Sequence, residues 1–192
     1  MNNTAVIENK RNKITPQLFA LFVGMASILM MFGGWTSAYI VKNAAGNWLE
    51  FSMPSMFFVS TITIILSSVA LHISYVSYKK QNEGLYKGML VVAFVLGILF
   101  IGFQYMGWKQ LFGLGVQLKG NVSGSFTYLL TGAHALHVLG GIAAISIALI
   151  RAFSVKFKYS QKRKNGLELV LYYWHFVDVL WIYLLIFLMN VK

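Results

Sequence analysis

The residues best suited to metal binding or proton chemistry in this chain are three histidines and one aspartate inside apolar segments. His134 and His137 are three residues apart, as are His175 and Asp178, and residues with this spacing share a helix face. Imidazole and carboxylate groups so arranged can ligate a metal or a haem, or exchange a proton. An ionisable group inside an apolar segment usually faces other helices, a polar cavity or a partner protein.

A compact metal site is disfavoured by the depth of these groups. His134 and His137 could chelate one metal with His175 or Asp178 as the third ligand. Counted from the same end, His137 is about 13 residues into its segment and His175 about six, an offset of about 10 Å along the axis. Asp178 matches the depth of His137 better. Ligand histidines also need hydrogen-bond partners of their own, which are scarce here. We therefore favour a packing lock, that is, a hydrogen bond between Asp178 and His137 or His134.

The composition is that of a membrane protein. Of the 192 residues, 58% are hydrophobic and 11% are charged, whereas roughly a quarter of a soluble domain is charged. Five apolar runs each reach the ~20 residues that a helix needs to cross a bilayer. We expect an all-α fold, a polytopic bundle in one domain over residues 17–192 after a polar tail at 1–16. The expected helices cover about 17–41, 54–78, 88–108, 126–150 and 169–190.

The charge distribution predicts the topology. Twelve of the 16 Lys and Arg residues lie in the tail and in the second and fourth loops, on the side of the N-terminus. The positive-inside rule places the N-terminus in the cytoplasm and the C-terminus on the opposite side. Because the basic residues occupy short loops, the net charge of +11 does not indicate nucleic-acid binding. The absence of cysteine excludes disulfides and thiolate metal sites.

Three classes of function remain open at this point. A small proton-coupled transporter would use Asp178, although broken helices, paired midplane charges and repeats are not evident. An orphan metal-binding membrane protein would use the histidines. An integral subunit that packs against a larger catalytic protein fits better, because Gly140, Ala144 and Ala148 form a stripe that lets another helix approach closely. Nucleotide-binding and nucleophile motifs are not found.

Two segments support a family resemblance. The segment 173–181, YWHFVDVLW, resembles the last-helix signature of subunit III of haem-copper terminal oxidases. The segment 130–141, LTGAHALHVLGG, is similar to the TG-x-HxLHV-x-GG motif of the same family. Gln104 and Glu168 are weaker features that are similar to the same family. The resemblance covers about Gln17 to Asn190.

The resemblance implies a helical subunit beside the catalytic subunit I. Subunits I and II would hold haem and copper, reduce oxygen and pump protons. This chain would be a subunit of that enzyme but would itself have no catalytic, cofactor-binding or metal-binding residues. Cytochrome c is the expected donor. A quinol oxidase or a nitric-oxide-reductase accessory protein is the alternative. The expected setting is a bacterial cell membrane, with lipids as further partners and a phospholipid as a bound molecule. The implied structural polar cluster comprises His134, His137, Trp174, His175, Asp178, Trp181, Glu168 and Gln104.

The first apolar segment departs from the family. Many members have seven helices, and this chain resembles a shorter form without the first two, so another subunit or lipid would complete their lipid-holding cleft. The family often has a buried glutamate eleven residues before a tyrosine, and Ile28 stands there, before Tyr39. Gly24, Gly33 and Gly34 in this segment would allow close helix contact.

Overall fold

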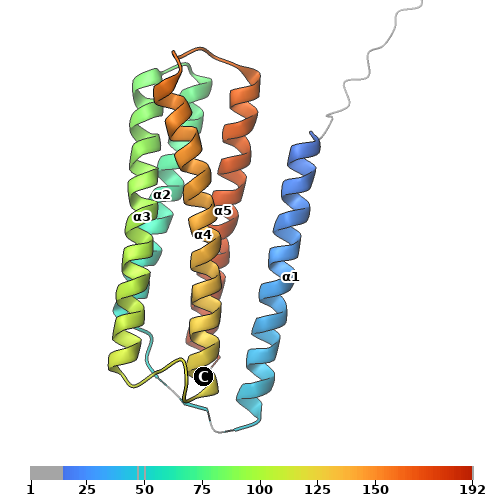
Figure 1. The fold of residues 1–192 in the computed structure, drawn as a ribbon, viewed down its shortest axis with the longest axis vertical. Coiled ribbons are helices and arrows are strands. Elements are labelled where there is room, and N and C mark those ends of the chain that lie inside the picture. Colours follow the sequence, from blue (N-terminus) through green and yellow to red (C-terminus); the bar gives the residue numbers. More distant parts are fainter. Residues whose placement is uncertain (1–14, 47, 50, 192) are drawn as a thin grey trace, which may run out of the picture.

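Five long α-helices make up the fold in a computed structural model that describes residues 15–46, 48–49 and 51–191. Each helix is long and apolar enough to span a membrane, which confirms the predicted all-α fold with five spans. Most of the predicted polar tail, including Lys10, Arg11 and Lys13, lies outside the described residues, as do Glu50 and Lys192. The helices are α1 (Pro16–Ala44), α2 (Ser55–Lys79), α3 (Glu83–Gly113), α4 (Val122–Ser154) and α5 (Gln161–Asn190) (Figure 1).

The helices extend beyond the limits that hydropathy predicts. The third helix begins at Glu83 rather than near 88, and the fifth begins at Gln161 rather than near 169. Hydropathy marks the part of a helix that suits lipid, whereas the helix itself continues to its capping residue. The Asn82 side chain accepts a hydrogen bond from the Leu85 backbone N–H at 3.2 Å and so caps α3.

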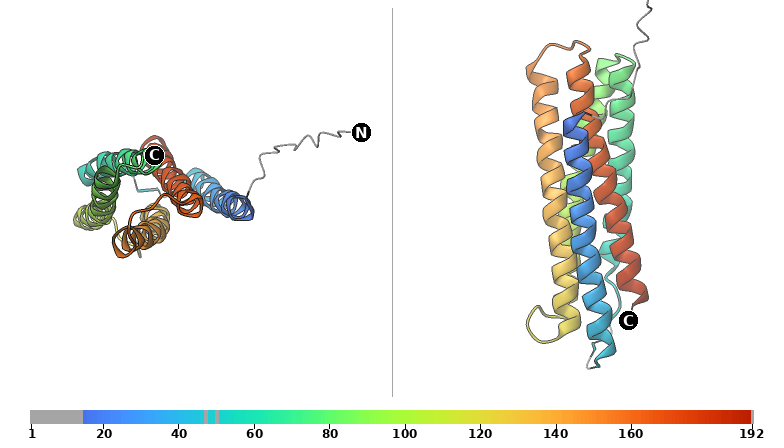
Figure 2. Two further views of the ribbon diagram at one scale, coloured as in Figure 1. Left: turned by 90° about the horizontal axis from the view of Figure 1, so that it is seen from above. Right: turned by 90° about the vertical axis from the view of Figure 1, so that its right-hand side faces the viewer.

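Helices α2 to α5 form a four-helix ring, and α1 lies outside it. Seen from above, α1 stands beside the ring rather than within it (Figure 2). Within the described residues α1 contacts α4 and α5 but neither α2 nor α3. The start of α1 lies at the same end of the molecule as the α2–α3 and α4–α5 connections (Figure 1). This arrangement brings the two motif-bearing helices, α4 and α5, to the centre of the molecule.

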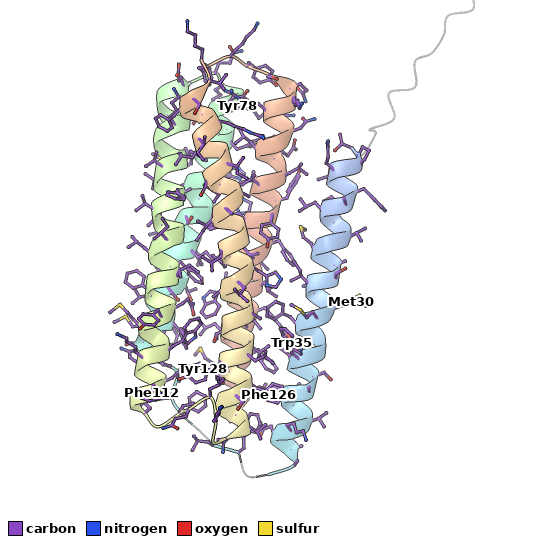
Figure 3. The ribbon with its side chains drawn as sticks, viewed as in Figure 1. Met30, Trp35, Tyr78, Phe112, Phe126 and Tyr128 are labelled. Carbon is purple, nitrogen blue, oxygen red and sulfur yellow. The ribbon has the colours of Figure 1, made fainter. Side chains whose placement is uncertain are left out.

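Serine hydroxyls hold α2 against α3. The Ser67 hydroxyl donates to the Ala93 carbonyl at 2.8 Å, and the Ser74 hydroxyl donates to the Tyr86 carbonyl at 2.9 Å. At the end of the bundle where α1 starts, the Tyr78 hydroxyl accepts from the Ser160 backbone N–H at 3.0 Å and ties α2 to the α4–α5 loop. Tyr78 lies at one end of the bundle and Tyr128 at the other (Figure 3). Hydroxyl groups of α2 therefore form hydrogen bonds with neighbouring segments of the chain.

The contact of α1 with the ring is narrow. Phe32 and Tyr39 are buried, and the Tyr183 hydroxyl of α5 donates to Thr36 Oγ1 at 3.1 Å. The glycines of this helix do not provide the close contact that the sequence predicts. A Cβ atom built at Gly24 or Gly33 would meet no described atom within 4 Å. Both glycines are exposed on α1.

Candidate functional site

The centre of the ring is built around two tryptophans of α5. Trp174 and Trp181 are both 0% exposed, and their spacing of seven residues places them on one helix face. A Cβ atom at Gly97 of α3 would lie 3.0 Å from the Trp174 ring, and one at Gly141 of α4 would lie 2.8 Å from it. The indole therefore fills a slot that two glycines open between α3 and α4.

Trp181 combines ring packing with a hydrogen bond. Its ring stacks on His134 of α4 at a centroid distance of 5.1 Å and meets Phe100 of α3 edge-on at 5.6 Å. Its Nε1–H donates to Thr61 Oγ1 of α2 at 2.9 Å. A buried indole needs such a partner for its N–H. Trp181 thus joins three helices to α5.

The two histidines of α4 face different neighbours. His134 is fully buried in the ring, and neither of its ring nitrogens has a hydrogen-bond partner within the described chain. The His137 ring meets Phe32 of α1 at 5.7 Å, and its Nδ1 lies 2.7 Å from the Ala133 carbonyl oxygen. The two imidazoles do not converge on a common ligand. Among residues 15–46, 48–49 and 51–191, no group of three His, Asp or Glu side chains could hold a metal ion.

The predicted hydrogen bond between Asp178 and His137 or His134 is wrong. Asp178 is 7% exposed, and the side chain of a neighbouring helix that interacts with its carboxyl group is Ser68 of α2. Asp178 Oδ1 and Ser68 Oγ are buried without a partner at hydrogen-bond distance in the described residues. Trp174 packs between α3 and α4, and Trp181 contacts α3, α4 and α2. The Asp178 carboxyl group interacts with α2 and not with the histidines of α4. The prediction therefore assigned Asp178 a partner on α4, whereas its interacting side chain is on α2.

Gln104 and Glu168 have different partners and lie in different parts of the molecule. Gln104 is buried, and its Nε2 donates to Ser60 Oγ at 3.1 Å, which joins α3 to α2. Glu168 is near the N-terminal end of α5, where it accepts from the Tyr172 hydroxyl at 3.3 Å and pairs with Lys164 at 3.9 Å. The eight predicted residues therefore do not form one cluster.

Small and hydroxyl-bearing residues, whose contacts were not predicted from the sequence, complete this core. Gly97 and Gly141 shape the Trp174 slot, and Thr131 Oγ1 accepts from Trp108 Nε1–H at 3.0 Å. The predicted stripe lies one position away from the close contact, because Gly141 rather than Gly140 meets Trp174. Thr131 and Gly141 both belong to the 130–141 segment, so the sequence indicated that they matter. Spacing along the sequence does not identify the residues that they contact.

The geometry therefore joins the 130–141 segment of α4 to the 173–181 segment of α5 in one aromatic core. Comparison with known proteins shows that the family model of cytochrome c oxidase subunit III matches residues 47–191. The chain belongs to the cytochrome c oxidase subunit III family. The match covers α2 to α5, the helices that form the ring, and it includes both of these segments.

Individual relatives agree with this family. The chain is 29% identical over 189 residues to the probable cytochrome c oxidase subunit 3 of Mycobacterium tuberculosis, covering 94% of this chain and 92% of that protein. It is 31% identical over 176 residues to cytochrome c oxidase subunit 3 of Thermostichus vulcanus, covering 88% and 84%. It is 28% identical over 172 residues to the heme-copper oxidase subunit I+III of Aeropyrum pernix, covering 84% of this chain and 21% of that protein. The chain is thus a subunit III of a haem-copper oxidase and a multi-pass membrane protein.

Proposed function

We propose that this chain is the structural subunit III of a bacterial cytochrome c oxidase and stabilises the oxygen-reducing, proton-pumping subunit I. Haem and copper would reside on subunits I and II, and cytochrome c or quinol would act only through the complex. The observation that carries the proposal is that the two family segments pack on each other in the core, where Trp174 and Trp181 are fully buried. The name of the Aeropyrum pernix relative supports subunit I as the partner, since a subunit III is joined there to a subunit I.

Co-purification tests this proposal. The full chain with a C-terminal affinity tag would be expressed in its native cells and extracted in a mild detergent. We expect stoichiometric recovery of a large haem-copper subunit and a copper-bearing subunit. Recovery of the chain alone, together with substrate flux from the purified chain in vesicles, would contradict the proposal and favour the transporter that uses Asp178.

We also propose that the N-terminus and the basic loop 151–164 face the cytoplasm of a bacterial cell. The positive-inside rule supports this orientation, and the loop lies at the end of the molecule where α1 starts (Figure 1). The chain has no cysteine, so Ser160→Cys introduces a single reactive thiol on an exposed residue. In intact cells this thiol should not react with a membrane-impermeant reagent, whereas it should react in inverted vesicles. Labelling in intact cells would contradict this orientation and place the loop outside the cell.

An anionic phospholipid is the bound molecule that we propose for the inner end. A cavity of about 590 Å³ lies there between α4 and α5, with basic side chains at its rim and apolar ones below. The Nη1 atom of Arg163 is buried there without a partner in the described residues. The double variant Arg151→Ala and Arg163→Ala should lose a lipid that native mass spectrometry detects in the parent protein. The rim and the apolar wall include Arg151, Lys156, Lys162, Arg163, Ala148 and Leu167.

A further inference from the structure

Two polar stripes face each other along the contact between α2 and α5. On α2 the stripe follows spacings of four, three and four residues, and on α5 it follows spacings of four, three and three, so each occupies one face of its helix. We call this pair of stripes the α2–α5 seam. It comprises Ser68, His72, Tyr75 and Lys79 on α2 and Glu168, Tyr172, His175 and Asp178 on α5.

The seam begins at the inner end of the molecule. Lys79 lies over the Tyr75 ring at 5.6 Å, and the Tyr75 hydroxyl is within interaction range of the Glu168 carboxylate. Glu168 also accepts from the Tyr172 hydroxyl. These groups lie where the basic loops end and the apolar spans begin. They form the entrance of the seam from the aqueous side.

Two histidines continue the seam into the apolar span. The rings of His72 and His175 have their centroids 5.7 Å apart, a separation that ring rotation or one bridging water closes. His72 is exposed and His175 is half-buried. Imidazole can accept a proton on one ring nitrogen and release the proton of the other. The ring is then unchanged in charge, and the proton has moved along the seam.

Asp178 is where the seam ends. Its Oδ1 and the Ser68 hydroxyl oxygen are buried and lack partners within the described residues, and burial of an unpaired charge is costly. Within the described residues, the side chain of a neighbouring helix that interacts with the Asp178 carboxyl is Ser68. The ionisable side chain of α2 that neighbours His175 is His72. Beyond Asp178 the contact passes to Ile64 and Trp181, both fully buried, and the Trp181 indole N–H, a donor that does not accept a proton, is bonded to Thr61 Oγ1. The seam therefore reaches Asp178 from one side of the membrane only.

We propose that the α2–α5 seam is a proton half-path through which the Asp178 carboxyl exchanges its proton with the aqueous side at Lys79 and Glu168. A proton from water passes through His72 and His175 and binds a carboxylate oxygen of Asp178, and the reverse sequence returns it to water. This activity goes beyond the structural role of the subunit. It belongs to this chain whichever subunits assemble with it.

Infrared spectroscopy of the full chain, with the subunits that co-purify, tests the half-path. Asp178→Asn should remove one protonated-carboxyl band. In D₂O that band should shift in the parent protein, and the shift should slow by about tenfold or more in His72→Leu/His175→Leu, because relaying side chains act as general acids and bases. His137→Leu, a histidine on α4 outside the seam, is the matched control and should leave the rate unchanged.

Two results would overturn the proposal. One is that Asp178→Asn leaves the protonated-carboxyl region of the spectrum unchanged. The other is that the exchange rate is the same in the double histidine variant as in the parent. If the double variant fails to fold, the single variant His72→Leu replaces it, since that side chain is exposed, and an unchanged rate there has the same meaning.

Discussion

Helix α1 and helix α2 are almost equally apolar but are covered by their neighbours to very different extents. The most apolar windows of the two helices have mean hydropathies of 1.9 and 2.0, yet 6% of that window is buried in α1 and 44% in α2. Hydropathy therefore reports that a helix suits the bilayer and does not report that it packs inside the protein. The ring α2–α5 has an interior of its own. The outer face of α1, where Met30 is 78% exposed, is left to lipid or to another subunit.

The largest contrast should come from the tryptophans of the two regions. Trp174→Ala empties the slot between Gly97 and Gly141 and should lower the free energy of unfolding by about 3–5 kcal/mol. Trp35→Ala on α1 removes a half-buried ring and should cost less than about 1 kcal/mol. Unfolding in mixed micelles measures both. Equal losses would mean that α1 is as integral to the fold as the ring.

A methyl group added to a glycine should have opposite effects in the two regions. At Gly141 the new Cβ would lie 2.8 Å from the Trp174 ring, so Gly141→Ala should cost about 1–3 kcal/mol through overpacking. At Gly33 it meets nothing within 4 Å among the described residues. Gly33→Ala should stabilise the helix by up to about 1 kcal/mol. The same micelle titration distinguishes them, and a loss at Gly33 would show that another chain approaches that face of α1.

The smallest effect should come from the bond that docks α1. Tyr183→Phe removes the donor to Thr36 Oγ1, and hydrogen bonds between membrane helices contribute about 0.6 kcal/mol on average. Tyr105→Phe, whose parent side chain is 54% exposed on α3, is the control and should be neutral. A loss above about 2 kcal/mol for Tyr183→Phe would contradict a loosely docked α1.

The class of fold could be predicted from the sequence, because membrane spans depend on hydropathy and length alone. Helix ends could not, since α3 and α5 continue through polar residues to capping positions at Asn82 and Ser160. The positions of His134 and His137 inside one motif were visible. Their divergence toward Trp181 and toward Phe32 was not visible, because it depends on the side of α4 on which each neighbouring helix packs.

Polar residues at mid-span illustrate the same limit. Spacing correctly placed Asp178 and His175 on one face of α5, but the choice of partner depends on how that helix is rotated. The structure turns the pair toward α2, where Ser68 and His72 recur at a spacing of four. The sequence contained that second stripe as well. It became meaningful only when the contact between α2 and α5 was known.

The central claim is that this chain is a component of a haem-copper oxidase, and the spectrum of the purified material tests it most directly. Protein captured through a C-terminal tag on the chain would be reduced with dithionite, and its absorbance would be compared with that of the air-oxidised sample. The account predicts haem bands and copper in a fixed ratio to the chain, with oxygen consumption when an electron donor is added. A stable, colourless chain without haem or copper, recovered from cells that respire aerobically, would contradict it.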